Sequence, residues 1–201
     1  MKTRTTSNLI TLVAAFLSLP VISAGAAAAH HRVRKGAVVV FCPMTVGGSF
    51  EARTASISGS VGFPGVPGAL DGSFQVDLKT LDTGIDLRNR HLRDNYLEIG
   101  KGAGFDTATL SGIVLDAKDP GAFTGKTTFR GTFELHGQKK DVTGEAQVRK
   151  QGEVYLVDAA FPLLVADFQI KKPSYLGVGV KNELKVRVSL EVAPVAEAAA
   201  K

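Results

Sequence analysis

The sequence has little of the material on which several common classes of site depend. Its 201 residues include one cysteine, four histidines and no tryptophan. One cysteine excludes an intramolecular disulfide framework and a multi-cysteine zinc or iron–sulfur site, and four histidines leave little for a histidine-rich metal site. We therefore predict no metal and no covalent cofactor. Charged residues make up 21% of the chain and apolar residues 44%, values that exclude disorder along its whole length.

Common catalytic motifs are also missing. The chain contains no G-x-S-x-G, no H-E-x-x-H and no phosphate-binding glycine loop, and we predict no catalytic residue. Asp82 and Asp86 bracket a turn, and turn and N-cap roles explain both carboxylates. A net charge of +5 is compatible with nucleic-acid binding, but clustered aromatic and basic strand motifs are absent. No nucleic-acid partner is predicted.

Residues 1–26 have the three-part pattern of a secretory signal peptide. Lys2 and Arg4 form a basic start, an apolar run follows, and Ala24-Gly25-Ala26 offers a small-residue cleavage site. The apolar run is shorter than the ~20 residues that span a bilayer, and Pro20 interrupts it, which argues against a retained membrane anchor. We therefore expect cleavage of residues 1–26 and a bacterial periplasmic or secreted protein, for which a single cysteine is no obstacle.

Most of the remaining chain alternates apolar and polar side chains, which indicates strands with one buried face. We predict eight strands, near residues 37–42, 50–58, 70–80, 108–116, 122–136, 140–149, 153–168 and 183–193. Many strands at short spacing form a sandwich or a barrel. Glycines at expected inner positions (Gly112, Gly131 and Gly144) favour an antiparallel barrel, because glycine lets a strand bend and leaves interior volume unfilled. The predicted fold class is all-β.

One segment breaks the alternation and predicts a short amphipathic helix between two strands. Leu92, Tyr96 and Ile99 recur at helical spacing, Asp86 is placed to cap the start, and Gly100 follows the end. The basic side chains of this helix are Arg88, Arg90, His91 and Arg93.

The domain organisation follows from these elements. Residues 27–36 are predicted to form a flexible basic arm, residues 37–193 the barrel domain, and residues 194–201 a disordered tail. The strands near 110–116 and 154–170 are apolar on both faces, so we expect a partner to cover their outer side: a homodimer first, a transient membrane-surface contact second. Cys42 ends an apolar run and reads as a buried, inert thiol, with a dimer-linking thiol as the alternative.

Two blocks of sequence resemble the YceI-like family of bacterial exported proteins. The first comprises Leu81-Asp82-Thr83-Gly84, Arg88, His91-Leu92-Arg93 and Tyr96-Leu97, and the second is the hairpin from Thr132 to Val142. The likeness covers roughly residues 45–193. The chain departs from the family at Asn89, where Asp is frequent, and over residues 100–107.

The resemblance implies a lipocalin-like barrel that holds a polyisoprenoid, an isoprenoid quinone or another amphiphilic lipid in an apolar cavity. The residues predicted to line the cavity are Phe50, Phe74, Val76, Leu92, Tyr96, Phe129, Phe133, Leu135, Val148, Val186 and Val188. Arg88, His91 and Arg93 are predicted to hold a head group at the mouth, where their donors suit a phosphate or a carbonyl.

Three functions remain open at this point. The first is a lipid carrier or buffer. The second is a lipid-acting isomerase or hydrolase on the same barrel, with His91 as acid–base group and Arg88 as anion-binding group. The third is a ligand-free dimeric interaction module. Strand number does not decide among them, because an eight-stranded barrel either fills with side chains or holds one ligand.

Overall fold

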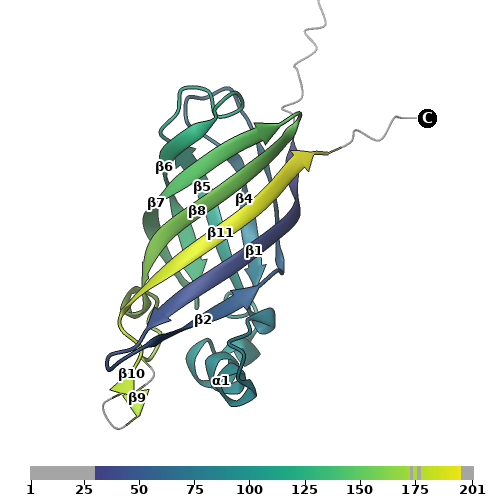
Figure 1. Ribbon diagram of the computed structural model, residues 1–201. Coiled ribbons are helices and arrows are strands. Elements are labelled where there is room, and N and C mark those ends of the chain that lie inside the picture. Colours follow the sequence, from purple (N-terminus) through teal and green to yellow (C-terminus); the bar gives the residue numbers. More distant parts are fainter. Residues whose placement is uncertain (1–29, 173, 176–177, 196–201) are drawn as a thin grey trace, which may run out of the picture.

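The computed structural model describes residues 30–172, 174–175 and 178–195, which form a closed antiparallel barrel (Figure 1). The barrel strands are β1 (His31–Pro43), β2 (Ser49–Thr54), β3 (Ile57–Gly62), β4 (Asp71–Asp77), β5 (Thr107–Leu115), β6 (Gly125–Leu135), β7 (Gln138–Gln151), β8 (Val154–Leu164) and β11 (Glu183–Pro194). They follow the order β11-β8-β7-β6-β5-β4-β3-β1-β2, and pairing of β1 with β11 closes the ring. Two short strands, β9 (Ser174–Tyr175) and β10 (Val178–Gly179), form a separate hairpin.

These nine barrel strands occupy eight positions around the ring, because β2 and β3 share one of them. β1 pairs with β2 along residues 38–43 and with β3 at His31 and Arg32. The strand predicted near 50–58 is therefore real but interrupted at Ala55 and Ser56. The predicted eight-stranded antiparallel barrel is confirmed.

The N-terminal part of β1 corrects the prediction of a flexible arm. Residues 31–36 belong to the strand, and His31 opposes Pro194 at the start of a long register with β11. The run of basic residues suggested an arm, but their side chains are mostly exposed while the backbone pairs. The His31 ring packs edge-on against Phe63 and Tyr155, with centroid distances of 5.2 Å to each.

Both predicted terminal segments extend beyond the described residues. The signal peptide at 1–26 and the start of the predicted arm at 27–29 lie outside them, as do residues 196–201 of the predicted tail. At the described ends the Val195 amide donates to the His30 carbonyl oxygen at 2.9 Å. We call this the terminal end of the barrel; the other is the helical end (Figure 1).

The prediction that the inner glycines leave interior volume unfilled is wrong. Gly131 and Gly144 are buried, but a Cβ at Gly144 would lie 2.5 Å from the Ala160 carbonyl oxygen and 2.6 Å from a carbon of the Phe129 ring. Neighbouring atoms thus occupy the room that glycine provides. Gly112 is exposed with φ +58°, at the β-bulge where the β5–β6 register shifts. That bulge is its role, since glycine adopts such a φ without strain.

The bulge also explains why β5 looks apolar on both faces. It places Leu110, Ile113 and Leu115 all on the cavity side, although their spacing is not strictly two. In β8 the alternation is regular, so that on the outer side Leu156 is half-buried and Leu164 is 41% exposed. The outer side of β8 is thus apolar along most of its length, as the sequence suggested, with Asp158 as its one charged residue. A homodimer and a membrane contact stay predictions.

The predicted helix between strands is confirmed and lies at the helical end of the barrel (Figure 1). It consists of α1 (Asp86–His91), continued by the π-helical turn η2 (Leu92–Tyr96). Two 3₁₀ turns flank this helix, η1 (Leu78–Thr80) before it and η3 (Ile99–Lys101) after it, and a third, η4 (Val165–Phe168), follows β8. None of the helices in the described part of the chain is long and apolar enough to cross a membrane.

Asp82, and not Asp86, holds the start of α1. Asp86 is already helical, Ile85 is the N-cap residue, and no side chain caps this end, so the predicted capping role of Asp86 is wrong. Asp82 Oδ1 accepts hydrogen bonds from the Gly84 amide at 2.8 Å and from Asn89 Nδ2 at 2.7 Å. The buried Asn89 thereby ties α1 to the preceding turn. These bonds hold the pKa of Asp82 below its ordinary value.

Replacing Gly144 with alanine tests the close packing of the barrel wall. We expect Gly144→Ala to lower the free energy of unfolding by roughly 1–3 kcal/mol, because its Cβ meets backbone as well as the Phe129 ring. Gly100→Ala is the control, since nothing lies within 4 Å of its Cβ position. Urea titration of both variants measures the difference, and equal stability of the two would contradict this packing.

Candidate functional site

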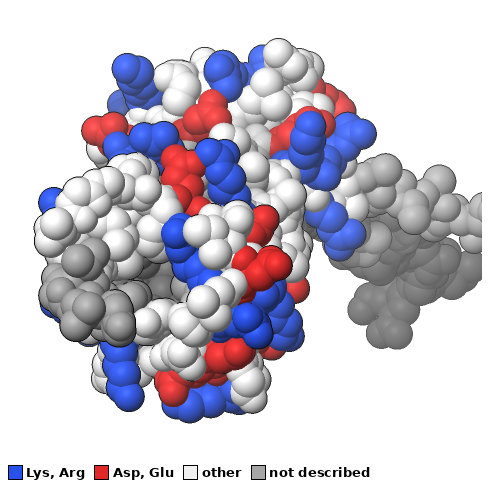
Figure 2. Space-filling view, turned by 60° about the horizontal axis from the view of Figure 1, so that its bottom comes forward, with Lys and Arg blue, Asp and Glu red and all other residues white. Residues whose placement is uncertain are grey.

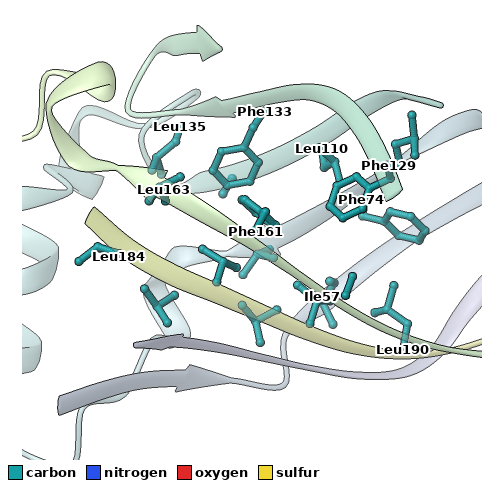
Figure 3. A pocket seen from close by; sticks show the side chains of 18 of the residues that line it. Ile57, Phe74, Leu110, Phe129, Phe133, Leu135, Phe161, Leu163, Leu184 and Leu190 are labelled. Carbon is teal, nitrogen blue, oxygen red and sulfur yellow. The ribbon is translucent and has the colours of Figure 1, made fainter. Parts of the chain in front are cut away.

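A cavity of about 260 Å³ lies inside the barrel. Its wall includes Phe63 and Tyr155 toward the terminal end and Leu92 and Tyr96 at the helical end. Figure 3 shows side chains from β4, β5, β6, β8 and β11 pointing into the same interior. Apart from the Cys42 thiol and the two tyrosine hydroxyls, every lining side chain is hydrocarbon. Such a wall offers apolar contact along its length and few hydrogen bonds.

The structure places all the predicted lining residues on this wall. They are Phe50, Phe74, Val76, Leu92, Tyr96, Phe129, Phe133, Leu135, Val148, Val186 and Val188. Their contact with a ligand stays a prediction. Other lining residues were not predicted from the sequence, among them Leu110, Phe161 and Leu163. Alternation along β8 was the signal for the last two, and Leu110 alternates regularly with Ala108, before the bulge in β5.

Phenylalanine rings packed edge to face build one side of the interior. Phe161 lies 6.1 Å from Phe129 and 5.4 Å from Phe133, measured between ring centroids. Phe133 in turn lies 5.8 Å from Phe168, which is only 2% exposed. Edge-to-face contacts of this kind add about 0.5–1.5 kcal/mol each beyond burial. They connect β6 with β8 and η4, and so fix the position of this wall.

At the terminal end two aromatic side chains pack together, and one of them makes a hydrogen bond to a loop. Phe63 and Tyr155 both line the cavity, and their rings lie 5.6 Å apart. The Tyr155 hydroxyl donates a hydrogen bond to the Gly121 carbonyl oxygen. The bond satisfies the one polar atom of that side chain and holds the loop between β5 and β6 against the barrel.

At the helical end a buried histidine joins three segments. His136 Nδ1 lies 2.9 Å from the Phe168 carbonyl oxygen, and Nε2 lies 2.9 Å from Glu98 Oε2. His136 and Gly137 form the two-residue turn between β6 and β7, and both have a positive φ. Glu98 also pairs with Lys101 at 2.8 Å. The segment after η2 is thereby attached to the barrel.

The three predicted mouth residues differ in position. The Arg88 guanidinium lies 4.3 Å from the centroid of the Phe50 ring, which lines the cavity. Arg93 Nη1 donates to the Lys79 carbonyl oxygen at 2.8 Å and so serves the fold. His91 is exposed and does not line the cavity. Of the three, Arg88 is the one for which the structure gives a contact with a side chain that lines the cavity.

Cys42 is buried on the cavity wall, as its position in an apolar run suggested. Burial raises the pKa of its thiol to about 11, while the Arg88 charge opposes that rise. The thiol is therefore protonated at neutral pH, and a thiolate nucleophile is absent. The described residues contain no group of three or more His, Cys, Asp or Glu side chains that could hold a metal ion.

A closed antiparallel barrel around an apolar cavity is the architecture of lipocalin-like barrels. Within that class the chain belongs to the YceI-like family, because the family model described as the YceI-like domain matches residues 26–192. The resemblance found in the sequence is thus confirmed. No curated protein matches the sequence of this chain.

Solved structures share the fold at low sequence identity. The crystal structure of BcnA from Burkholderia cenocepacia is 18% identical, with a TM-score of 0.61 over 78% of this chain and 95% of the other. A polyisoprenoid-binding domain from Saccharophagus degradans, implicated in plant cell wall breakdown, is 17% identical, with a TM-score of 0.60 over 82% and 98%. A mutant YceI protein from Campylobacter jejuni reaches a TM-score of 0.52 at 14% identity, over 70% and 82%.

Acid should weaken the contacts of Glu98 with Lys101 and His136. The hydrogen bond from Lys101, and then that from His136, hold the pKa of Glu98 below its ordinary value of 4.5. A carboxyl with a lowered pKa stabilises the fold fully above its ordinary value, and that contribution is lost as pH falls through the lower one. We expect Glu98→Gln to be less stable than the parent protein at pH 7, with the difference shrinking below about pH 4.5.

Urea unfolding between pH 7 and pH 3 measures this difference. Asp94→Asn is the matched control: Asp94 is exposed on η2 and makes no ion pair with the described residues, so its effect should not change with pH. A Glu98→Gln effect that stays constant across the range would show that the carboxylate charge contributes nothing.

Proposed function

We propose that the protein binds a long-chain isoprenoid or a related amphiphilic lipid inside the barrel and acts as its carrier or buffer. The observation that carries the proposal is the cavity wall, which is hydrocarbon except for one thiol and two hydroxyls. The family assignment supports it, and one structural neighbour is described as a polyisoprenoid-binding domain. An isoprenoid quinone fits the same wall.

The energetics favour carrying over trapping. Burial of each CH₂ group from water contributes about 0.8 kcal/mol, so a chain of many isoprene units would exceed the practical affinity limit of about −20 kcal/mol. The relevant reference state is the membrane, where the lipid is already surrounded by hydrocarbon. The net preference for the protein is then modest, as release to a membrane or another protein requires.

Export is part of the proposal. The signal-peptide pattern at residues 1–26 supports delivery to the periplasm or the outside of a bacterial cell. A lipid carrier in an aqueous compartment between or outside membranes has a clear physical task, because water separates the source of the lipid from its destination.

The alternative functions have less support from the site. An isomerase or hydrolase using His91 requires that side chain at the cavity, whereas it is exposed and outside the lining set. A ligand-free interaction module does not explain a continuous hydrocarbon cavity. We therefore propose a binding protein without catalytic activity.

Mass spectrometry of the organic extract from natively purified protein tests the proposal. We expect an isoprenoid or similar amphiphile at a fixed ratio to protein, and uptake of such a lipid from vesicles by protein that has been stripped. Protein that carries no extractable lipid and takes none up would overturn the proposed function.

Two neighbouring alanines in β8 provide a sharper version of this test. Ala159 lines the cavity, while Ala160 does not and is paired with Glu145 and Arg187, both exposed. We expect Ala159→Phe to fill cavity space and lose most of the bound lipid, and Ala160→Phe to keep it. Lipid content per mole of folded protein is the measurement. Equal retention by both variants would contradict ligand binding inside the barrel.

A further inference from the structure

One cation lies against the wall of an otherwise uncharged cavity. None of the lining side chains is charged, and the Arg88 guanidinium lies over the Phe50 ring. Phe50 is the β-sheet partner of Cys42, which also lines the cavity, and the Arg88 charge acts on the Cys42 thiol. Arg88 therefore lies against the lining residue Phe50, on β2 beside the end of β1.

The Arg88 side chain has no polar partner within the described residues, in contrast to three other basic residues at the helical end. Lys79 pairs with Asp106, Lys101 pairs with Glu98, and Arg93 donates to a carbonyl oxygen. Arg90, two residues further along α1, is exposed to water. Arg88 is half-buried, so its charge is partly removed from water without an anion to compensate it.

The helix that carries Arg88 is held in place. Asn89, the next residue, accepts from the Thr83 amide at 2.8 Å and donates to Asp82 at 2.7 Å. The Phe50 ring supports the guanidinium on one face. A cation that is already positioned loses little conformational freedom when a ligand binds it.

Figure 2 shows the helical end, where Lys, Arg, Asp and Glu side chains run together in one mixed band beside an uncharged area. Because both signs are interspersed, this band as a whole does not attract anions. A preference for anionic over neutral ligands must therefore come from a single cation in contact with the cavity wall.

We propose that Arg88 binds an anionic head group, so that the ligand class of the cavity is an apolar chain ending in a phosphate or carboxylate. A guanidinium donates two parallel hydrogen bonds to either anion, whereas a hydroxyl or a quinone carbonyl accepts a single, weaker one. This inference rests on the proposed function and narrows it: a neutral isoprenoid quinone or alcohol satisfies the apolar wall but leaves Arg88 without a counter-ion.

Three probes with apolar chains test the head group. We would measure the binding of farnesyl phosphate, farnesol and a long-chain fatty acid to stripped protein by calorimetry below their aggregation concentrations. We expect farnesyl phosphate to bind roughly 10- to 100-fold more tightly than farnesol, as a charge-assisted pair of hydrogen bonds allows. Comparison with the fatty acid shows whether the site takes phosphate, carboxylate or both.

Arg88→Gln should remove the preference for farnesyl phosphate, because it weakens the binding of farnesyl phosphate far more than that of farnesol. Arg90→Gln is the matched control on the same helix and should keep the preference. Arg88→Lys retains the positive charge but not the two parallel N–H donors of the guanidinium, so it should keep only part of the preference. Circular dichroism establishes that each variant is folded.

The outcomes separate this inference from the proposed function. Equal binding of farnesol and farnesyl phosphate by the parent protein would overturn the role of Arg88 while supporting a lipid cavity. Equal weakening of both ligands in Arg88→Gln, or an equal effect of Arg90→Gln, would also overturn it. Failure of every probe to bind, with no lipid in the native extract, would overturn the proposed function itself.

Discussion

Pairing of β1 with β11 is the constraint on which the rest of the structure depends. The two strands lie next to each other through His31–Pro194 at one end and Phe41–Lys185 at the other, and this register closes the sheet. Closure leaves an inner face that no second sheet covers, so the inward side chains meet only one another. Without this pairing the apolar inner faces of both strands would be open to water, and no cavity would exist.

Packing around the closed ring decides how much of the interior stays open. Small residues on the wall do not simply create volume, because neighbouring atoms fill the space beside Gly131 and Gly144. The edge-to-face phenylalanines then hold β6, β8 and η4 together and set the limits of the cavity. Space remains where side chains from the two sides of the barrel do not reach one another (Figure 3). The cavity is therefore a property of the whole ring and not of any one strand.

The sequence predicted the fold well where alternation was regular. Strands such as β7 and β11 show a strict period of two, and their inward residues Val148, Val186 and Val188 could be named in advance. The prediction failed where backbone geometry overrides side-chain pattern. The bulge at Gly112 moves the alternation of β5 by one residue, and the basic residues after His31 are compatible with a strand as well as an arm.

The site was harder to predict than the barrel, for a physical reason. Arg88, His91 and Arg93 look equivalent in sequence, but their positions depend on how α1 meets the barrel, which rests on the contact of Asp82 with Asn89. In the function that we propose, the enclosed hydrocarbon space exists to hold a chain-like ligand. A crystal structure of protein purified from its native source tests that claim most directly. We expect continuous density for an elongated chain inside the barrel, ending beside Arg88 and Phe50. An interior closed by collapsed side chains, with no such density, would contradict this function.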